Sequence, residues 1–175
     1  MKGLLENDII RLRAPEPEDL HKFYSWENDT STWGFGSTIT PFSRFTLKQY
    51  LIDSNNDFYS DKQLRLVIVH KESEEAIGAI DLYDFDPFNS RAGVGIFIDE
   101  DYREKSIGHQ ALLLLEEYAS EFLKIHQLYA NISTKNNASI GLFTKCGFKK
   151  AGELKDWLSR SEGYDNIFVF QKIYK

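Results

Sequence analysis

The hydrophobic period of this sequence changes once, between residues 98 and 106, and this change constrains the fold more than any other feature. Residues 64–70, 76–83 and 91–98 are short runs rich in β-branched residues, which is typical of strands. Apolar side chains then recur every third or fourth position, the spacing of one helix face. They are Ile107, Ala111, Leu114, Leu115, Tyr118 and Phe122. The expected core is therefore a strand, a turn and a long helix over residues 106–123.

The flanking segments extend this unit into a mixed α/β (α+β) fold. We expect further strands at 9–13, 128–132, 150–157 and 167–173, and helices at 15–26, 46–52 and 137–145, the last ending at a left-handed Gly147. The order β α α β β β α β α β β predicts a mostly antiparallel sheet with one central crossover helix. Because the 175 residues contain no linker or repeat, residues 1–175 are expected to form a single domain.

Composition argues against several classes of function. The chain carries 21 Lys and Arg against 27 Asp and Glu, a net charge of −6, and it has no basic run, which disfavours nucleic-acid binding. It has no apolar stretch of about 20 residues, so no membrane span is expected. The single Cys146 and four scattered histidines give no metal-ligand spacing and no internal disulfide. We therefore expect a cytoplasmic protein; its acidity suits an amine substrate, although solubility alone accounts for that charge.

The loop before the long helix has the properties of a phosphate site. Residues 102–109 read YREKSIGH and lie between a buried strand and a helix N-terminus. Amides there have no partner within the helix, and the helix dipole favours an anion. Every strand-to-helix turn exposes such donors, so this loop alone does not separate a phosphate site from an ordinary turn.

A second motif follows at residues 136–148, NNASIGLFTKCGF. The two motifs together resemble the GNAT superfamily of N-acetyltransferases, with its Arg/Gln-x-x-Gly-x-Gly/Ala loop followed by Asn-x-x-(Ala/Ser)-x-x-Leu-(Tyr/Phe)-x-x-x-Gly-Phe. Within it, the chain is most similar to the branch of spermidine and ribosomal-protein N-terminal acetyltransferases. The resemblance implies acetyl-CoA as co-substrate and no metal. The cofactor-binding residues that it implies are Phe97, Ile98, Arg103, Glu104, Lys105, Ser106, Ile107, Gly108, His109, Asn136, Ser139, Phe143 and Lys145.

Three residues depart from the family pattern. Ser106 stands where the first loop glycine is usual, which a helical backbone would tolerate, and Glu104 places an acid beside the expected phosphates. Phe143 replaces the tyrosine that would protonate the departing thiolate in the spermidine-acetylating relatives. Ser139 is then the best substitute proton donor, and Cys146 is a weaker candidate. The alternative is that these two residues only belong to the helix surface or the core packing.

Candidate acceptor residues follow the second strand of the hairpin. Asp81 and Asp84 are the candidate catalytic bases, and their alternative is that they are solvated acids at a strand end. The resemblance places Asp84 on an acidic acceptor position, whereas Gly93 stands where that branch has a Glu. Half of the acidic acceptor site is thus missing, which disfavours a polyamine. The loop at 28–44 contains the aromatic residues Trp33, Phe35 and Phe42. They either cover the core beside the first helices or form a wall of the acceptor pocket, and we favour the first interpretation.

The function implied is acetyl transfer from acetyl-CoA to a primary amine in a ternary complex. The amine is a protein N-terminus, an amino-acid-like amine or a polyamine, carried by a small molecule or a peptide. A homodimer or higher homo-oligomer is compatible with this function. The alternative is a coenzyme-A-binding sensor domain with little or no turnover.

Overall fold

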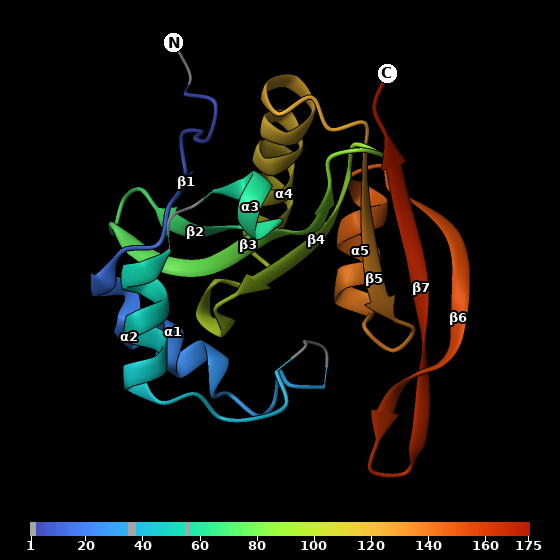
Figure 1. Ribbon diagram of the computed structural model, residues 1–175, viewed down its shortest axis with the longest axis horizontal. Helices are drawn as coiled ribbons and strands as arrows, with labels where there is room; N and C mark the ends of the chain where they lie inside the picture. Colours follow the sequence, from blue (N-terminus) through green and yellow to red (C-terminus); the bar gives the residue numbers. More distant parts are fainter. Residues whose placement is uncertain (1–2, 35–37, 55–56) are drawn as a thin grey trace.

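The strands form one mixed sheet in the computed structural model, which describes residues 3–34, 38–54 and 57–175 (Figure 1). The strand order across the sheet is β1-β2-β3-β4-β5-β7-β6. Neighbouring strands run antiparallel apart from β4 and β5, which are parallel. The strands are β1 (Ile10–Arg13), β2 (Leu64–His70), β3 (Glu75–Asp86), β4 (Arg91–Ile98), β5 (Gln127–Ser133), β6 (Lys149–Arg160) and β7 (Gly163–Ile173).

The helices confirm the expected element order with shifted ends. They are α1 (Leu20–Glu27), α2 (Arg44–Asp53), α3 (Phe58–Asp61), α4 (Ile107–Glu117) and α5 (Asn137–Lys145). The expected helix at 106–123 is α4 followed by a π-helical turn at Tyr118–Phe122. The short α3 and the 3-10 turns at Pro17–Asp19 and Glu100–Tyr102 were not predicted, because four residues or fewer are too short to show a helical period. In the described part of the chain, no helix is long and apolar enough to cross a membrane.

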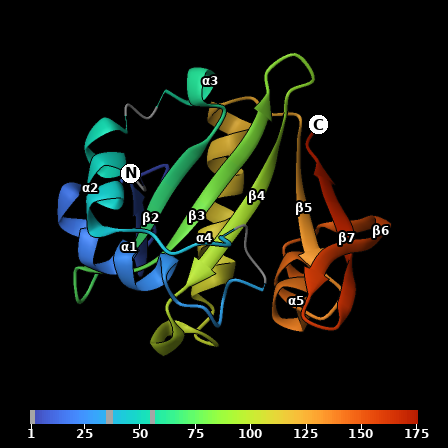
Figure 2. The same cartoon turned by 60° about the horizontal axis from the view of Figure 1, so that its bottom comes forward.

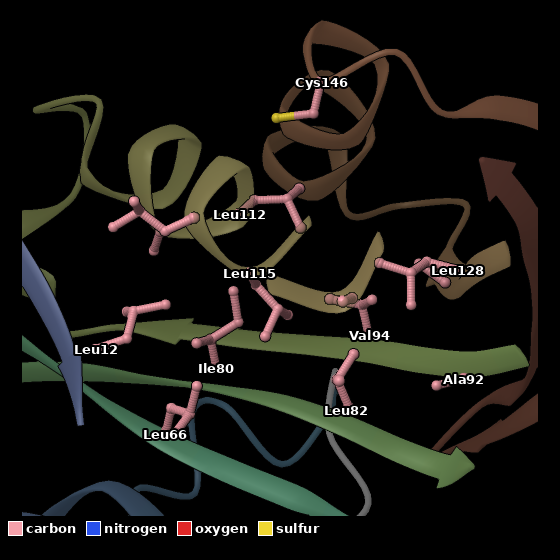
Figure 3. Close-up of a cluster of buried hydrophobic side chains, with 14 of the residues drawn as sticks. Leu12, Leu66, Ile80, Leu82, Ala92, Val94, Leu112, Leu115, Leu128 and Cys146 are labelled. Carbon is pink, nitrogen blue, oxygen red and sulfur yellow. The ribbon is translucent and has the colours of Figure 1, made fainter. Parts of the chain in front are cut away.

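Helices cover both faces of the sheet, and the strand alternation decides which side chains they meet. Figure 3 shows Leu112 and Leu115 of α4 directed at Ile80 and Val94 of the sheet, all of them buried. On the opposite face, α1 and α2 lie over β2 (Figure 2), where Phe23 and Leu47 join a second buried cluster with Val67 and Val69. Successive strand residues point to opposite faces, so both helical layers find apolar partners on one strand.

The sheet splits between its only two parallel neighbours among the described strands. The ladder between β4 and β5 contains three residue pairs, Arg91–Gln127, Ala92–Leu128 and Gly93–Tyr129. Beyond Gly93, β4 stays paired with β3 and β5 stays paired with β7, so the two strands move apart (Figure 2). We call the opening between residues 94–98 and 130–133 the strand split.

A buried ion pair joins α4 to the last strand. Glu116 is 4% exposed, and its Oε1 accepts from Lys172 Nζ at 2.5 Å and from the Tyr174 hydroxyl at 2.7 Å. Lys172 Nζ also donates to the Cys146 carbonyl at 2.6 Å, just after α5. Burial, and then the nearby Glu116 carboxylate, raise the pKa of Tyr174. This cluster connects the end of α4 to the end of α5 and to β7.

Replacing Lys172 by Met should therefore destabilise the fold. The substitution leaves the Glu116 carboxylate buried without its cation, which costs about 3–5 kcal/mol in such sites and is measurable by urea denaturation. The matched control is Lys155→Met, because Lys155 pairs with Glu153 at 2.7 Å on the exposed surface. The Lys155→Met substitution should hardly change the urea concentration at the midpoint of unfolding. Equal shifts for both variants would contradict a structural role for the buried pair.

Candidate active site

The end of β4 presents backbone groups that the sheet leaves unpaired. Peptide groups along a strand point alternately to its two neighbours, so the β4 groups directed toward β5 lose their ladder partner where the split opens. Phe97 and Ile98 lie at this end of β4. Arg103 folds back onto them: its Nε donates to the Ile98 carbonyl at 2.9 Å, and its guanidinium lies 5.9 Å from the Phe97 ring centroid.

The loop between β4 and α4 points a row of amides outward. Within the described part of the chain, the N–H groups of residues 104–109 donate to no backbone carbonyl; the first bond of α4 runs from Gln110 to Ser106 at 3.1 Å. Arg103 and Lys105 are exposed beside these donors. Free amides, a helix N-terminus and two cations are the features that anion-binding sites use, and binding of a phosphate here stays a prediction.

The loop backbone is strained at two residues. Glu104 has φ 60° and Ser106 has φ 61°, both in the left-handed region. Ser106 is the N-cap of α4, not a helical residue. The condition under which a serine would be tolerated there is therefore not met, and this position requires the backbone freedom that glycine supplies. The strained pair shapes the outward curve of the amides.

Gly108 and its neighbours fix the start of α4 against the split. A Cβ at Gly108 would lie 3.4 Å from Leu142 Cδ2 and 3.7 Å from Ile98 Cγ1, so this helix turn packs closely between β4 and α5. Ile107 is buried, which leaves its backbone amide as the group able to meet an anion. His109 is half-buried in the first turn.

The N-terminus of α5 borders the split from the other side. Asn136 caps this helix, with its Oδ1 accepting from the Ser139 amide at 3.1 Å. Ser139 is half-buried, and Lys145 is exposed at the helix end. Phe143 is 2% exposed and meets the Phe148 ring edge-on at 5.0 Å, so its ring is part of the core. Contact of Phe143 with a cofactor stays a prediction.

Asp81 is not the solvated strand-end acid that the sequence suggested. Both of its carboxylate oxygens bind Arg65, at 2.7 Å from Nε and 3.1 Å from the second terminal nitrogen. Arg65 also pairs with Glu27 of α1 at 3.0 Å. The pKa of Asp81 is raised, because the effect of burial exceeds the lowering by the Arg65 charge. Because its oxygens are already occupied, Asp81 is poorly placed to take a proton from an incoming amine.

Asp84 lies apart from Asp81, beside a cavity at the closed end of the split. It was expected after the strand, but it lies inside β3 at a bulge, with φ 48° and an exposed side chain. The cavity has a volume of about 580 Å3. Its lining residues are Lys62, Asp84, Phe85, Asp86, Arg91, Gln127, Tyr129, Val169 and Gln171.

The expected aromatic wall is described in part. Trp33 is half-buried and donates from its indole to the Glu27 carbonyl at 2.9 Å, which holds the loop to α1. Phe42 packs against the cluster under α1 and α2. Phe35 lies outside the described residues. For Trp33 and Phe42 the favoured reading, cover over the first helices, matches the structure.

Two residues of this region escaped the sequence reasoning. Arg65 sits opposite Asp81 across the β2–β3 ladder, and Tyr83 sits opposite Gly93 across the β3–β4 ladder. Their strands were predicted, but the register that brings these pairs together cannot be read from alternation alone. An arginine on an otherwise apolar strand was the available signal for the first pair.

Ser106→Gly should stabilise the protein. A non-glycine residue in the left-handed region costs about 1–2 kcal/mol, and glycine removes most of that cost, so we expect a gain of about 1 kcal/mol in the free energy of unfolding. Ser106→Ala is the matched control, because it removes the hydroxyl and keeps the strained φ. An alanine variant as stable as the glycine variant would contradict the strain.

Comparison with known proteins agrees with this geometry. A family model described as an acetyltransferase (GNAT) domain matches residues 10–149. Spermidine N(1)-acetyltransferase of Escherichia coli K12 is 27% identical, over 94% of this chain and 88% of that protein. An uncharacterized N-acetyltransferase, p20 of Bacillus licheniformis, is 26% identical over 95% of this chain and 93% of that protein.

Solved structures share the fold. The Vibrio cholerae spermidine N-acetyltransferase in complex with CoA and spermine superposes with a TM-score of 0.84 at 20% identity, covering 95% of this chain and 96% of that one. The ribosomal-protein-S5-alanine acetyltransferase of Vibrio fischeri gives 0.84 at 20% identity, over 96% and 94% of the two chains. The chain belongs to the GNAT family of N-acetyltransferases and is an acyltransferase.

Proposed function

We propose that this protein transfers the acetyl group of acetyl-CoA to a primary amine by direct attack, with both substrates bound at once. The observation that carries the proposal is the position of the strand split next to the outward amides of residues 104–109. The strand split holds the thioester between two strands, and the amides hold the diphosphate at the N-terminus of α4.

The residues around the split fit the parts of coenzyme A. Its pyrophosphate takes the free amides of residues 104–109, with Arg103 and Lys105 as nearby cations. The pantetheine arm follows the unpaired end of β4 near Phe97 and Ile98. Asn136 uses its carbonyl oxygen to cap α5, which leaves its two N–H groups for the pantetheine amides.

The chemistry needs charge stabilisation at the thioester oxygen. The amine nitrogen attacks the carbonyl carbon, the carbon–sulfur bond breaks, and sulfur leaves with the electron pair. Unpaired β4 amides stabilise the negative charge that develops on oxygen, an effect of about 10²–10³ in rate. The proton that nitrogen loses passes to water, and through water to Asp84 in the neighbouring cavity, since Asp81 is held by Arg65.

The weak base favours an α-amine as acceptor. A polyamine or lysine amine with pKa about 10.4 is neutral about 0.04% of the time at pH 7, a cost of about 4.6 kcal/mol, whereas an α-amine costs about 1.1–1.4 kcal/mol. A peptide N-terminus or an amino-acid-like amine therefore suits this site better than a polyamine, although spermidine is the substrate named for two of the similar proteins.

Gly108→Asp should abolish CoA binding. The new carboxylate would meet Leu142 and Ile98 on one side and the pyrophosphate on the other. We expect the parent to bind CoA with a Kd in the micromolar range, about −8 kcal/mol, and the Asp variant to show no saturable heat in calorimetry. Gly108→Ala is the control, because its Cβ makes a contact of 3.4 Å and adds no charge. An Asp variant that binds like the Ala variant would overturn the phosphate assignment.

Proton delivery to the thiolate should depend on Ser139. Phe143 cannot donate, so Ser139→Ala should lower kcat by about 10²-fold if Ser139 supplies the proton. Phe143→Tyr should raise kcat if no residue supplies it at present. A tyrosine hydroxyl at a position 2% exposed costs about 1–3 kcal/mol when it finds no partner, so thermal unfolding is measured first. An unchanged kcat in both variants would show that leaving-group protonation does not limit the rate.

A CoA-binding sensor without turnover is the alternative, favoured by the buried Phe143 and the ion-paired Asp81. Free thiol release from acetyl-CoA with pooled amines separates the two functions. The acetyltransferase releases thiol only when an amine is present. The sensor binds acetyl-CoA and releases none.

Self-association is part of the same proposal. One solved spermidine N-acetyltransferase from Vibrio cholerae is dodecameric. In this chain β6 is an edge strand with mostly exposed side chains, including Trp157. Sedimentation analysis measures the oligomeric state, and a monomer at micromolar concentration would remove this part of the proposal.

A further inference from the structure

Tyr83 occupies the space that a side chain at residue 93 would need. A Cβ added to Gly93 would lie 2.4 Å from Tyr83 Cε2 and Cζ, closer than real Cβ contacts come. The ring therefore lies flat over the β4 backbone, and any residue larger than glycine at position 93 must displace it. Gly93 is buried beneath the ring.

The ring also reaches across β4 to β5. Its centroid is 6.0 Å from that of Tyr129, in an edge-to-face arrangement at 81°. Tyr129 is the last β5 residue in the parallel ladder. Tyr83 thus bridges the strand split at its closed end.

This position separates the cavity from the split. Along one face of β4 come Arg91, Gly93 and Gly95 in turn, because alternate strand residues share a face. Arg91 lines the cavity, and Gly95 faces Asp81, whose Oδ2 lies 3.7 Å from where a Gly95 Cβ would be. Tyr83 covers the residue between them. An acceptor amine that reaches the split near Gly95 therefore meets the Tyr83 ring on its way to the cavity.

The groups around Tyr83 carry little surplus negative charge. Burial raises the pKa of Tyr83 to about 12, so the phenol is neutral at physiological pH. Arg65 pairs with both Asp81 and Glu27, so that cluster keeps one surplus negative charge. Among the lining residues that the structure describes, Lys62 and Arg91 balance Asp84 and Asp86 in the cavity. A second ammonium group placed in the cavity would lose its hydration without gaining an uncompensated carboxylate.

We infer that Tyr83, lying over Gly93, is a specificity-determining residue that closes the acceptor site to polyamines and restricts it to acceptors with a single amino group. The inference rests on the proposed acetyltransferase function. A carboxylate on β4 at position 93 would bind a second ammonium group. The Tyr83 ring fills that space, and its neutral phenol carries no negative charge.

Equilibrium binding to the unaltered protein is the first test. The CoA-loaded parent is titrated with spermidine, and we expect a Kd weaker than about 1 mM. Saturable binding tighter than that would overturn the inference. This measurement needs no turnover, so it remains informative if the parent releases no thiol with any amine, the result that would overturn the proposed function instead.

Selectivity is the second test, with kcat/KM measured for spermidine and for a tripeptide with a free N-terminus and an amidated C-terminus. Tyr83→Ala combined with Gly93→Glu removes the ring and supplies a carboxylate on β4. The ratio of tripeptide to spermidine kcat/KM should fall about tenfold or more, at a CoA affinity close to that of the parent. An unchanged ratio would overturn the inference.

Tyr83→Phe is the matched control and covers the case in which the double variant fails to fold. It keeps the ring over Gly93 and loses only the hydroxyl. The ratio should stay within about twofold of the parent value, because the ring closes the site. The ratio for the Phe variant could instead fall as far as we expect for the double variant. That result would show that the hydroxyl, and not the ring, excludes the polyamine.

Discussion

The parting of β4 from β5 is the constraint on which the rest of this structure depends. A sheet satisfies its backbone groups by pairing every strand, yet here the parallel ladder stops after Gly93 and Tyr129. The strands can part because each keeps its outer neighbour, β3 for β4 and β7 for β5. The crossover helix α4 connects them and brings its N-terminus to the open end. The hydrogen-bond donors at the open end are therefore backbone N–H groups, and no side chain has to supply them.

Side chains from neighbouring elements set the shape and charge of that opening. Arg103 binds the end of β4, Gly108 lies where α4 packs between Ile98 and Leu142, and Ser106 has a left-handed backbone at the start of α4. On the acceptor side, Tyr83 and the Arg65 pair reduce the space and the negative charge. The same sheet thus has amides without backbone partners and two cations at the open end of the split, and the Tyr83 ring at its closed end.

Local patterns predicted most of the fold, and they pointed to the loop at 102–109, where the structure leaves the amides of residues 104–109 without backbone partners. The 3.6-residue period found α4, the strand runs found β2 and β4 with their correct ends, and the expected left-handed Gly147 has φ 87°. What failed depends on long-range register. The pairing of Arg65 with Asp81, the cover of Tyr83 over Gly93 and the burial of Phe143 each arise when distant strands or layers meet, and no local pattern encodes those contacts.

Backbone hydrogen exchange on binding of coenzyme A tests the central claim most directly, because the claim concerns backbone amides. The β4 amides of residues 94–98 that point away from β3, and the amides of residues 104–109, exchange with solvent in the free protein if they are unpaired. Binding of CoA should slow their exchange while the amides of β1 and β2 stay unchanged. CoA that binds with full affinity and protects neither segment would contradict the account.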